Sequence, residues 1–282
     1  MSHRYDDLTD YVLEKIHAGE CDIAFHELEN NVSQGDADSL ALLGGFYIYG
    51  IGVDTDIQQG INMLEKSVQM ECGDACYELW KIYSGEDQIV RTDYDIAINY
   101  LRKGMELGNS KCYGDMGCCY LNGEYVVKNP KLGYDYSKIA AEDGVPCGII
   151  NCAICNDDGI GTVRNAYEAS QWYRKYLEME PDNDFAMVRL AICLADPYEM
   201  FGISISDDML REALFYCEQA MLKDNPEAYL IYGWFYEMGK IVPQNYDEAY
   251  NYIKKSAELG NDFAKEHLKS YFKDIFGRYY VR

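Results

Sequence analysis

The sequence predicts an all-α protein, a right-handed superhelical solenoid of stacked antiparallel helix pairs with about fifteen helices and no sheet. Three observations support this prediction. A motif of glycine, tyrosine three residues later and glycine three residues after that recurs along the chain. A helix-capping Asp or Asn stands four residues before a small residue in successive repeats. A large residue follows each small one by three positions, and this spacing marks one buried helical stripe.

The repeats keep a regular period. Gly44 and its equivalents lie 36, 37, 36, 38, 42 and 36 residues apart, a spacing typical of helical repeat proteins. A small residue at most of these positions lets two helices approach closely, which offsets the roughly 1 kcal/mol that Gly costs relative to Ala inside a helix. The equivalents of Gly44 are Trp80, Gly117, Ala153, Ala191, Gly233 and Lys269.

Each repeat is predicted to hold two antiparallel helices. In the first unit, one helix runs from about Ser39 to Tyr49 and stops at Gly50, a glycine able to adopt the left-handed conformation after a helix end. The second helix follows the cap at Asp56 and ends near Met70. The equivalent caps of later units are Asp93, Asn129, Asn165 and Asn245.

We predict a single repeat domain over residues 1–282. Residues 1–35 form a degenerate N-terminal helix pair, and residues 36–261 form six repeat units. Residues 262–282 form a capping helix, from Phe263 to about Phe276, and a tail, because a solenoid needs atypical terminal units to cover its apolar ends. The fifth unit departs from the pattern through Asp196-Pro197 and an insertion that runs to Ser206.

The unit resembles the repeat of the Sel-one-like repeat (SLR) family, a relative of the tetratricopeptide repeat. The resemblance covers residues 20–275 and implies a scaffold or adaptor for protein–protein interaction, with no chemistry of its own. A narrower alternative is a bacterial immunity protein that neutralises a cognate toxin; an effector or signalling adaptor is equally open. The matching residues are Leu43-Gly44, Tyr47, Gly50, Gly52 and Val53 in the first unit, and Ala249, Tyr252, Ala257 and Gly260 in the sixth.

Charge and composition exclude several classes of function. Lys plus Arg number 25 against 48 Asp plus Glu, a net charge of −23 that repels phosphate backbones, so we expect no nucleic-acid ligand. No window of about 18 apolar residues exists, so we expect no membrane span. The start of the chain, residues 1–7, carries two acids and leads into no apolar segment, so we expect a cytoplasmic protein. We also expect a monomer; the alternative is an oligomer built by end-to-end stacking.

The eleven cysteines raise the question of disulfides or a metal site. Their number is odd and a cytoplasmic protein keeps its thiols reduced, so small buried side chains are the favoured role. Cys152 and Cys155 form a CxxC pair, but structural zinc needs four ligands, each about 2.3 Å away for sulfur, and no His or carboxylate stands at matching spacing. We therefore expect no metal and no other cofactor.

No residue set assembles an active site, so we expect no enzyme. The four histidines, His3, His17, His26 and His267, lie near the two ends of the chain, far from most cysteines in sequence. An enzyme is the rival class, since some cysteine-rich relatives of the family have been described as β-lactamases. We expect no Ser-x-x-Lys serine of the kind that activity requires.

The first helices of the units carry the predicted partner-binding surface. A helical wheel places offsets 3, 6 and 10 from each unit's start opposite the core, toward the concave groove. We predict a basic protein partner, anchored by Trp234 and steered by Asp115 and Asp158. The alternative for Trp234 is packing against the fifth repeat. The predicted surface comprises Leu42, Tyr49, Glu78, Lys81, Asp115, Asn122, Asn151, Asp158, Arg189, Trp234 and Met238.

Overall fold

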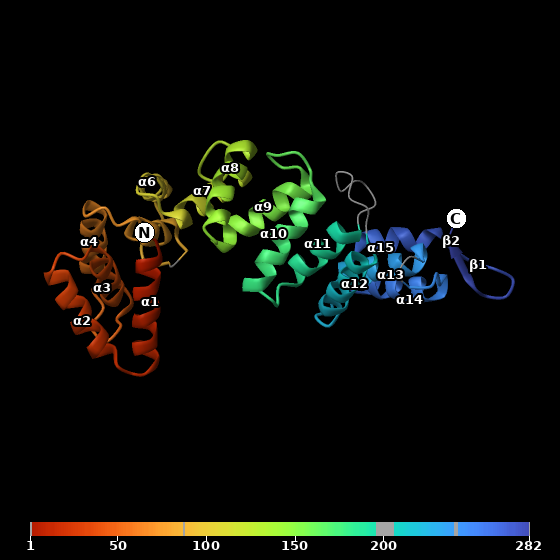
Figure 1. Cartoon of the computed structure of the whole chain (residues 1–282), viewed down its shortest axis with the longest axis horizontal. Helices are drawn as coiled ribbons and strands as arrows, with labels where there is room; N and C mark the ends of the chain where they lie inside the picture. The colour runs from red at the N-terminus through yellow and green to blue at the C-terminus, as the bar shows by residue number, and fades with distance from the viewer. Residues whose placement is uncertain (1, 87, 196–205, 240–241, 282) are drawn as a thin grey trace. The chain divides into compact units, whose positions relative to one another are not determined.

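The computed structural model describes residues 2–86, 88–195, 206–239 and 242–281, and within these ranges it contains fifteen α-helices (Figure 1). The predicted all-α fold of stacked helix pairs is confirmed. The chain divides into two compact units, Met1–Gly148 and Ile149–Arg282, and each is described by itself. The single repeat domain over residues 1–282 stays a prediction. Most of the insertion predicted in the fifth unit, residues 196–205, lies outside the described residues.

The helices follow one another with short connections. The first unit holds α1 (Ser2–His17), α2 (Cys21–Ser33), α3 (Ala37–Tyr49), α4 (Ile57–Gln69), α5 (Gly73–Ser84), α6 (Tyr94–Glu106), α7 (Ser110–Asn122) and α8 (Pro130–Glu142). Helix α9 (Pro146–Asp158) begins at the end of the first unit. The second unit continues with α10 (Ala166–Met179), α11 (Asp184–Ala195), α12 (Asp207–Met221), α13 (Pro226–Met238), α14 (Tyr246–Glu258), α15 (Asp262–His267), a 3-10 turn (Leu268–Ser270), β1 (Tyr271–Lys273) and β2 (Tyr279–Val281).

The two helices of a repeat pack antiparallel, and a buried serine marks the pairing. Ser67, near the end of α4, donates its hydroxyl to the carbonyl oxygen of Ala37 at the start of α3, at 2.7 Å. Ser256 of α14 makes the same bond to Pro226 of α13, at 2.5 Å. Both serines are fully buried, so the packing that removes each hydroxyl from water also supplies its acceptor.

The predicted caps and helix stops are confirmed. The carboxylate of Asp56 accepts the backbone N–H of Gln59 at 2.9 Å, and Gly50 ends α3 with a left-handed φ of +67°. A Cβ added at Gly44 would lie 2.9 Å from the carbonyl oxygen of Gly60, so the close approach of α3 and α4 requires glycine there. Side-chain caps of the same kind are present at Asp93, Asn129, Asn165 and Asn245.

Two predictions for the C-terminal end are wrong. The capping helix predicted from Phe263 to about Phe276 is α15, which ends at His267, and the chain contains a two-stranded antiparallel sheet of β1 and β2. The carboxylate of Asp274 accepts the backbone N–H groups of Phe276 (2.8 Å) and Arg278 (2.9 Å), which closes the turn. The aromatic residues on both sides of this turn favour strands over helix.

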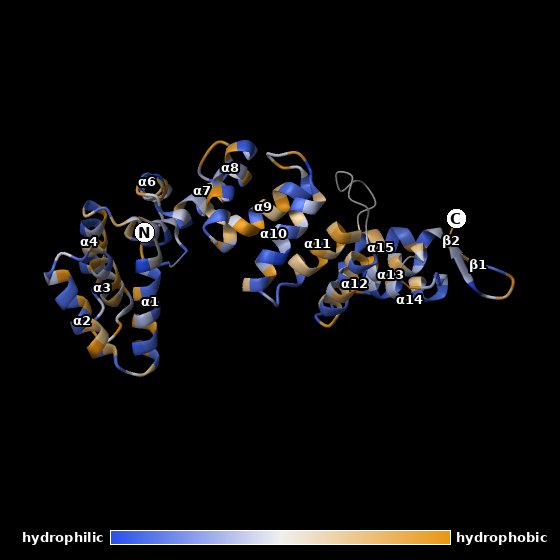
Figure 2. Cartoon of the chain, in the orientation of Figure 1, coloured by the Kyte–Doolittle hydropathy of each residue, from blue (hydrophilic) through white to orange (hydrophobic). Residues whose placement is uncertain are grey.

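Apolar side chains of paired helices form the cores. In the second unit, Leu190 of α11 and Phe235 of α13 are fully buried in the same cluster as Tyr173 of α10. Figure 2 shows α11 as a predominantly hydrophobic helix, whereas α10 carries many polar residues. Helix α11 is therefore the central element of this core, and the residues that it leaves at the surface define the site described next.

Candidate partner-binding surface

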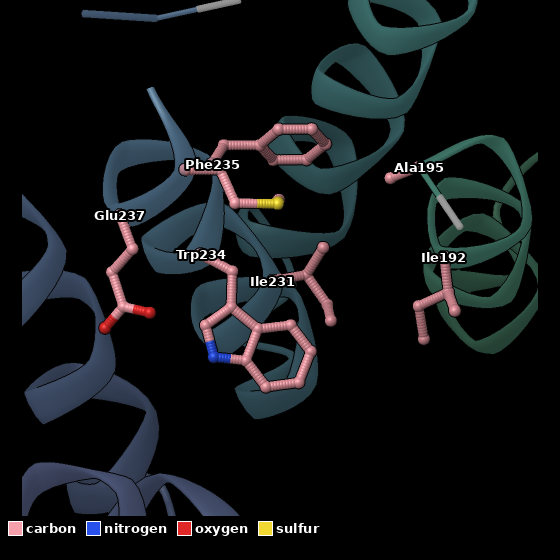
Figure 3. Close-up of a pocket in the computed structure, with 7 residues that line it drawn as sticks. Ile192, Ala195, Ile231, Trp234, Phe235 and Glu237 are labelled. Carbon is pink, nitrogen blue, oxygen red and sulfur yellow. The ribbon is translucent and has the colours of Figure 1, made fainter. Parts of the chain in front are cut away.

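An apolar pocket of about 430 Å³ lies between α11 and α13 in the second unit. Figure 3 shows Ile192 and Ala195 of α11 facing Ile231 and Trp234 of α13 across open space. Trp234 is 37% exposed, although it stands beside the buried residues Ile231 and Phe235. The remaining lining residues are Phe235, Glu237 and Met238.

The sequence directs these side chains to one side of the helix. Ile231, Trp234 and Met238 stand at offsets 3, 6 and 10 from the start of the sixth repeat, and all three line the pocket. Ile192 stands at offset 6 from the start of the fifth repeat and lines the opposite wall. Two residues that the helical wheel predicted to face a partner, Trp234 and Met238, therefore lie in one site.

The wall of the pocket behind Trp234 is held by the C-terminal elements. The carboxylate of Glu237 lies 2.7 Å from Nε2 of His267 and also accepts the hydroxyl of Tyr271. Burial, together with this bond to Glu237, raises the pKa of Tyr271. The indole ring of Trp234 meets the ring of His267 edge-on, with 6.4 Å between centroids. Trp234 thus contacts α15 on one side and borders the pocket shared with the fifth repeat on the other.

A charge cluster lies one helical turn before Ile192 on α11. Nη2 of Arg189 lies 2.6 Å from a carboxylate oxygen of Asp157 and 2.6 Å from one of Asp158. The Asp157 side chain is 3% exposed, and its burial raises its pKa although Arg189 opposes this shift. Nε of Arg189 is buried without a hydrogen-bond partner in the part of the chain that the structure describes. Asp158 and Arg189, both predicted to bind a partner, therefore bind each other.

In the first unit, the chain's own first helix covers part of the predicted surface. Tyr5 of α1 is 5% exposed and packs in one cluster with Leu79 and Ile82 of α5. Asp6 forms an ion pair with Lys111 of α7, at 2.6 Å. A helix that only capped the end of the solenoid would contact no helix beyond α3. Helix α1 also contacts α5 and α7, so its contacts extend further than those expected of the predicted degenerate pair.

Three predicted residues lie against this helix. Leu42, Tyr49 and Glu78 line a cavity of about 220 Å³ together with residues of α1. Glu78 also forms an ion pair with Lys81, at 2.7 Å. Tyr49 is 51% exposed at the last position of α3. These predicted residues therefore form one surface, but in this structure helix α1 of the same chain covers it.

The remaining predicted residues are not gathered into a site. Asp115 of α7 accepts the indole N–H of Trp80 at 2.9 Å and is half-buried, and this burial raises its pKa. Asn122 is exposed at the last position of α7, directly before Gly123. Asn151 is half-buried within α9. Of the two acids predicted to steer a partner, only Asp158 is exposed.

Sequence reasoning missed the groups that hold each site in place. It did not identify Lys111, nor His267 and Tyr271, which fix Glu237 beside the pocket. One available signal was the apolar stripe of the N-terminal segment, spaced by three and four residues. That stripe comprises Tyr5, Leu8, Val12 and Ile16.

The expectation about the Ser-x-x-Lys tetrapeptide needs a correction. The sequence does contain one, Ser270-Tyr271-Phe272-Lys273. The Ser270 hydroxyl donates to the carbonyl oxygen of His267 at 2.8 Å, and Nζ of Lys273 lies 4.6 Å from the centre of the Tyr279 ring. Because residues 271–273 form a strand, this segment lacks the helical turn that brings residues i and i+3 to one face.

The cysteines show no arrangement suited to a metal among the described residues. All eleven are free thiols, and eight of them are buried. Within the described ranges, no group of three or more His, Cys, Asp or Glu side chains could hold an ion. The helices in these ranges are also too short or too polar for any of them to cross a membrane.

The repeat matches a known family. The model of the Sel1 repeat, the unit of the Sel-one-like family, matches residues 37–71, 74–109, 110–145, 148–177 and 226–261. Among curated proteins, the chain is similar to the protein NMB1327 of Neisseria meningitidis serogroup B, with 24% identity over 247 residues. The match covers 86% of this chain and 48% of the relative, so the chain spans about half the length of that protein.

Two solved structures share the fold. The protective antigen c5321 of uropathogenic Escherichia coli, which displays an SLR fold, is 24% identical with a TM-score of 0.64; the match covers 87% of this chain and 50% of that one. A Sel1 repeat protein from Oxalobacter formigenes is 20% identical with a TM-score of 0.57, covering 94% of this chain and 75% of that one.

Proposed function

Because the chain belongs to the Sel1 repeat family, whose members are generally non-catalytic scaffolds for protein–protein interaction, we propose that it binds a protein partner and catalyses no reaction. We assign the docking site to the pocket between α11 and α13. The observation that carries this assignment is the exposure of Trp234 (37%) and Met238 (42%) on one wall of an apolar pocket.

The pocket has the properties of an interface anchor. Binding energy concentrates where an aromatic residue fills or lines a pocket that becomes fully desolvated, surrounded by polar contacts. Trp234 supplies the aromatic ring, and Ile192 and Ile231 supply apolar walls on two helices. A large apolar side chain of the partner would bury these surfaces together.

The partner is proposed to be basic. The net charge of −23 attracts a basic protein over long range and raises its association rate. Glu237 carries a carboxylate at the pocket, where His267 and Tyr271 hold its position. The affinity should therefore fall as salt is added, because salt screens this attraction.

A cytoplasmic location and a monomeric state complete the proposal. Eleven free thiols, eight of them buried, suit a compartment that keeps cysteines reduced. Light scattering of the purified 32.3 kDa chain should give the mass of one copy. A series of larger masses would instead support the alternative of end-to-end stacking.

The docking site can be tested by affinity capture followed by measurement with the purified partner. The chain, its Trp234→Ala variant and a Phe263→Ala control would each be used as bait in lysate of the native organism. Phe263 is a matched control because it is an aromatic residue of the second compact unit, lies outside the pocket and is 82% exposed. With the purified partner, we expect Trp234→Ala to weaken binding about 30-fold or more, corresponding to about 2 kcal/mol, and the control to bind as the unmodified chain does.

The outcomes separate the parts of the proposal. Unchanged affinity of the Trp234→Ala variant would remove the pocket as the docking site. An affinity independent of salt would contradict a basic partner. A captured toxin whose activity the chain blocks would select the immunity protein among the possible adaptors.

A further inference from the structure

The N-terminal turn of helix α1 contacts helices of three different repeats. It packs beside α3, its Tyr5 enters a cluster with α5, and its Asp6 reaches α7. Arg4 adds an ion pair with Asp36, the cap of α3, at 2.5 Å. In Figure 1 the N-terminus lies at the end of α1 that is remote from the α1–α2 connection. The N-terminal turn of α1 therefore contacts the first helices of three successive repeats, whereas Val12 packs with residues of α2 and α3.

The contacts of Tyr5 and Asp6 define what this surface recognises. The Tyr5 ring is buried against apolar side chains of α3 and α5, including Leu79 and Ile82. The next residue, Asp6, pairs with Lys111, whose Nζ also lies 3.6 Å from Asp74 and 5.8 Å from the centre of the Tyr5 ring. The surface thus provides apolar side chains that contact an aromatic ring and a cation, Lys111, that pairs with the acidic residue directly after it.

Helix α1 is held less firmly than a core helix. Among its described side chains, from residue 4 onward, only Tyr5 and Val12 are buried. A cavity of about 220 Å³ remains between α1 and the helices beneath it, and Leu13 is 45% exposed. Three residues, 18–20, join α1 to α2, and Gly19 among them has a φ of +75°. Helix α1 is therefore less buried than the repeat helices, and its main core contact is Val12, which shares a cluster with Leu28, Leu43 and Phe46.

We propose that α1 is an internal competitor on a binding groove formed by α3, α5 and α7. The ligand of this groove is an amphipathic helix of a partner protein that presents an aromatic residue followed directly by an acidic one. That helix takes the positions of Tyr5 and Asp6 and displaces α1. This site is separate from the pocket at Trp234, and the inference does not depend on it.

The proposal predicts how occupancy by α1 changes the measured affinity. A ligand that needs an empty groove binds with an apparent Kd equal to its intrinsic Kd divided by the fraction of chains in which the groove is open. A tethered segment competes strongly, since a short connection gives it an effective concentration in the millimolar range. Weakening α1 within the chain should therefore strengthen binding of an added helix.

The test uses a fluorescent peptide with the sequence of α1, residues 2–17, titrated with the full chain by fluorescence anisotropy. We expect it to bind the Tyr5→Ala/Asp6→Lys variant at least about tenfold more tightly than the unmodified chain. A chain with Asp10→Lys is the matched control, because Asp10 is exposed on the same helix and the charge change is identical. In the peptide, Asp6→Lys should weaken binding at least about tenfold and Asp10→Lys should not.

Hydrogen exchange of the unmodified chain provides a test that needs no variant. Amides of α1 should exchange faster than those of α3, since α1 opens while the repeats stay folded. Equal protection of α1 and α3 would make α1 a fixed cap and overturn the proposal. A folded double variant that binds the peptide no better than the unmodified chain would also overturn it. Dimers formed by exchange of α1 would assign the groove to a second copy instead.

Discussion

Nε1 of Trp80 donates a 2.9 Å hydrogen bond to a carboxylate oxygen of Asp115, 35 residues further along the chain. Trp80 stands where most repeats have a small residue, and Asp115 stands at a position predicted to face a partner. The bond joins α5 to α7, the first helices of two successive repeats. The large residue at position 80 therefore connects repeats, and Asp115 is engaged within the protein.

Replacing Trp80 with phenylalanine should destabilise the first unit. The variant keeps an aromatic ring but removes the N–H donor, so the half-buried Asp115 carboxylate loses a partner. We expect the free energy of unfolding in urea to fall by about 1–3 kcal/mol. Trp172→Phe is the control, since the face of the Trp172 ring makes a cation–π contact with Nζ of Lys175, 5.3 Å from the ring centre. An equal loss in both variants would contradict a specific role for the hydrogen bond.

Stability should depend on pH through Asp115. Burial raises the pKa of this carboxyl in the folded chain, so the folded state binds the proton more tightly than the unfolded state does. Its contribution therefore favours folding as the pH falls through the folded pKa toward the unfolded value of about 3.9, and is lost as the pH rises. Urea unfolding across this range should show a weaker dependence for Asp115→Asn. Parallel pH profiles of the two proteins would disprove this contribution.

Removing Arg189 should cost far more than removing an exposed arginine. In Arg189→Gln the Asp157 carboxylate, which is 3% exposed, loses its cation. Breaking a buried ion pair in this way costs about 3–5 kcal/mol. The control is Arg211→Gln, where the pair with Asp208 is at the surface (68% and 92% exposed) and contributes at most about 1 kcal/mol. Urea unfolding measures both, and similar losses would show that Asp157 does not need its partner.

The buried thiols should resist alkylation in the native protein. Burial raises the pKa of Cys72 to about 11 and that of Cys217 to about 12. Because the thiolate is the reactive form, iodoacetamide near pH 8 should label both slowly in the folded chain and completely in urea. Mass spectrometry of peptides after timed labelling gives the two rates. Rapid native labelling of Cys217 would mean that α12 opens readily.

Helix boundaries could be predicted because their determinants are local. Asp56 caps α4 through the backbone of a residue three positions away, and Gly50 ends α3 through its own φ. The same reasoning failed beyond His267, where the repeat pattern was extended into a segment with different local chemistry. Asp274 and Gly277 signal a turn, and the aromatic residues beside them signal strands.

The candidate sites could be predicted only in part. The helical wheel grouped Trp234 with Met238, because residues three and four apart on one helix share a face. It also assigned Asp115 to a partner, since a wheel shows which direction a side chain takes but not which side chain of another helix meets it. Trp80 meets Asp115 because α5 and α7 are neighbours in space.

The sequence by itself determined the helix pairs, their caps and the face of each helix that is buried, because these follow from interactions within a few residues. Only the tertiary structure decided what lies on the opposite face. Asp6 and Lys111 are 105 residues apart, and they pair because the packing of all the helices between them brings α7 under α1. Such a contact depends on the summed geometry of several repeats, which no periodicity within one repeat encodes.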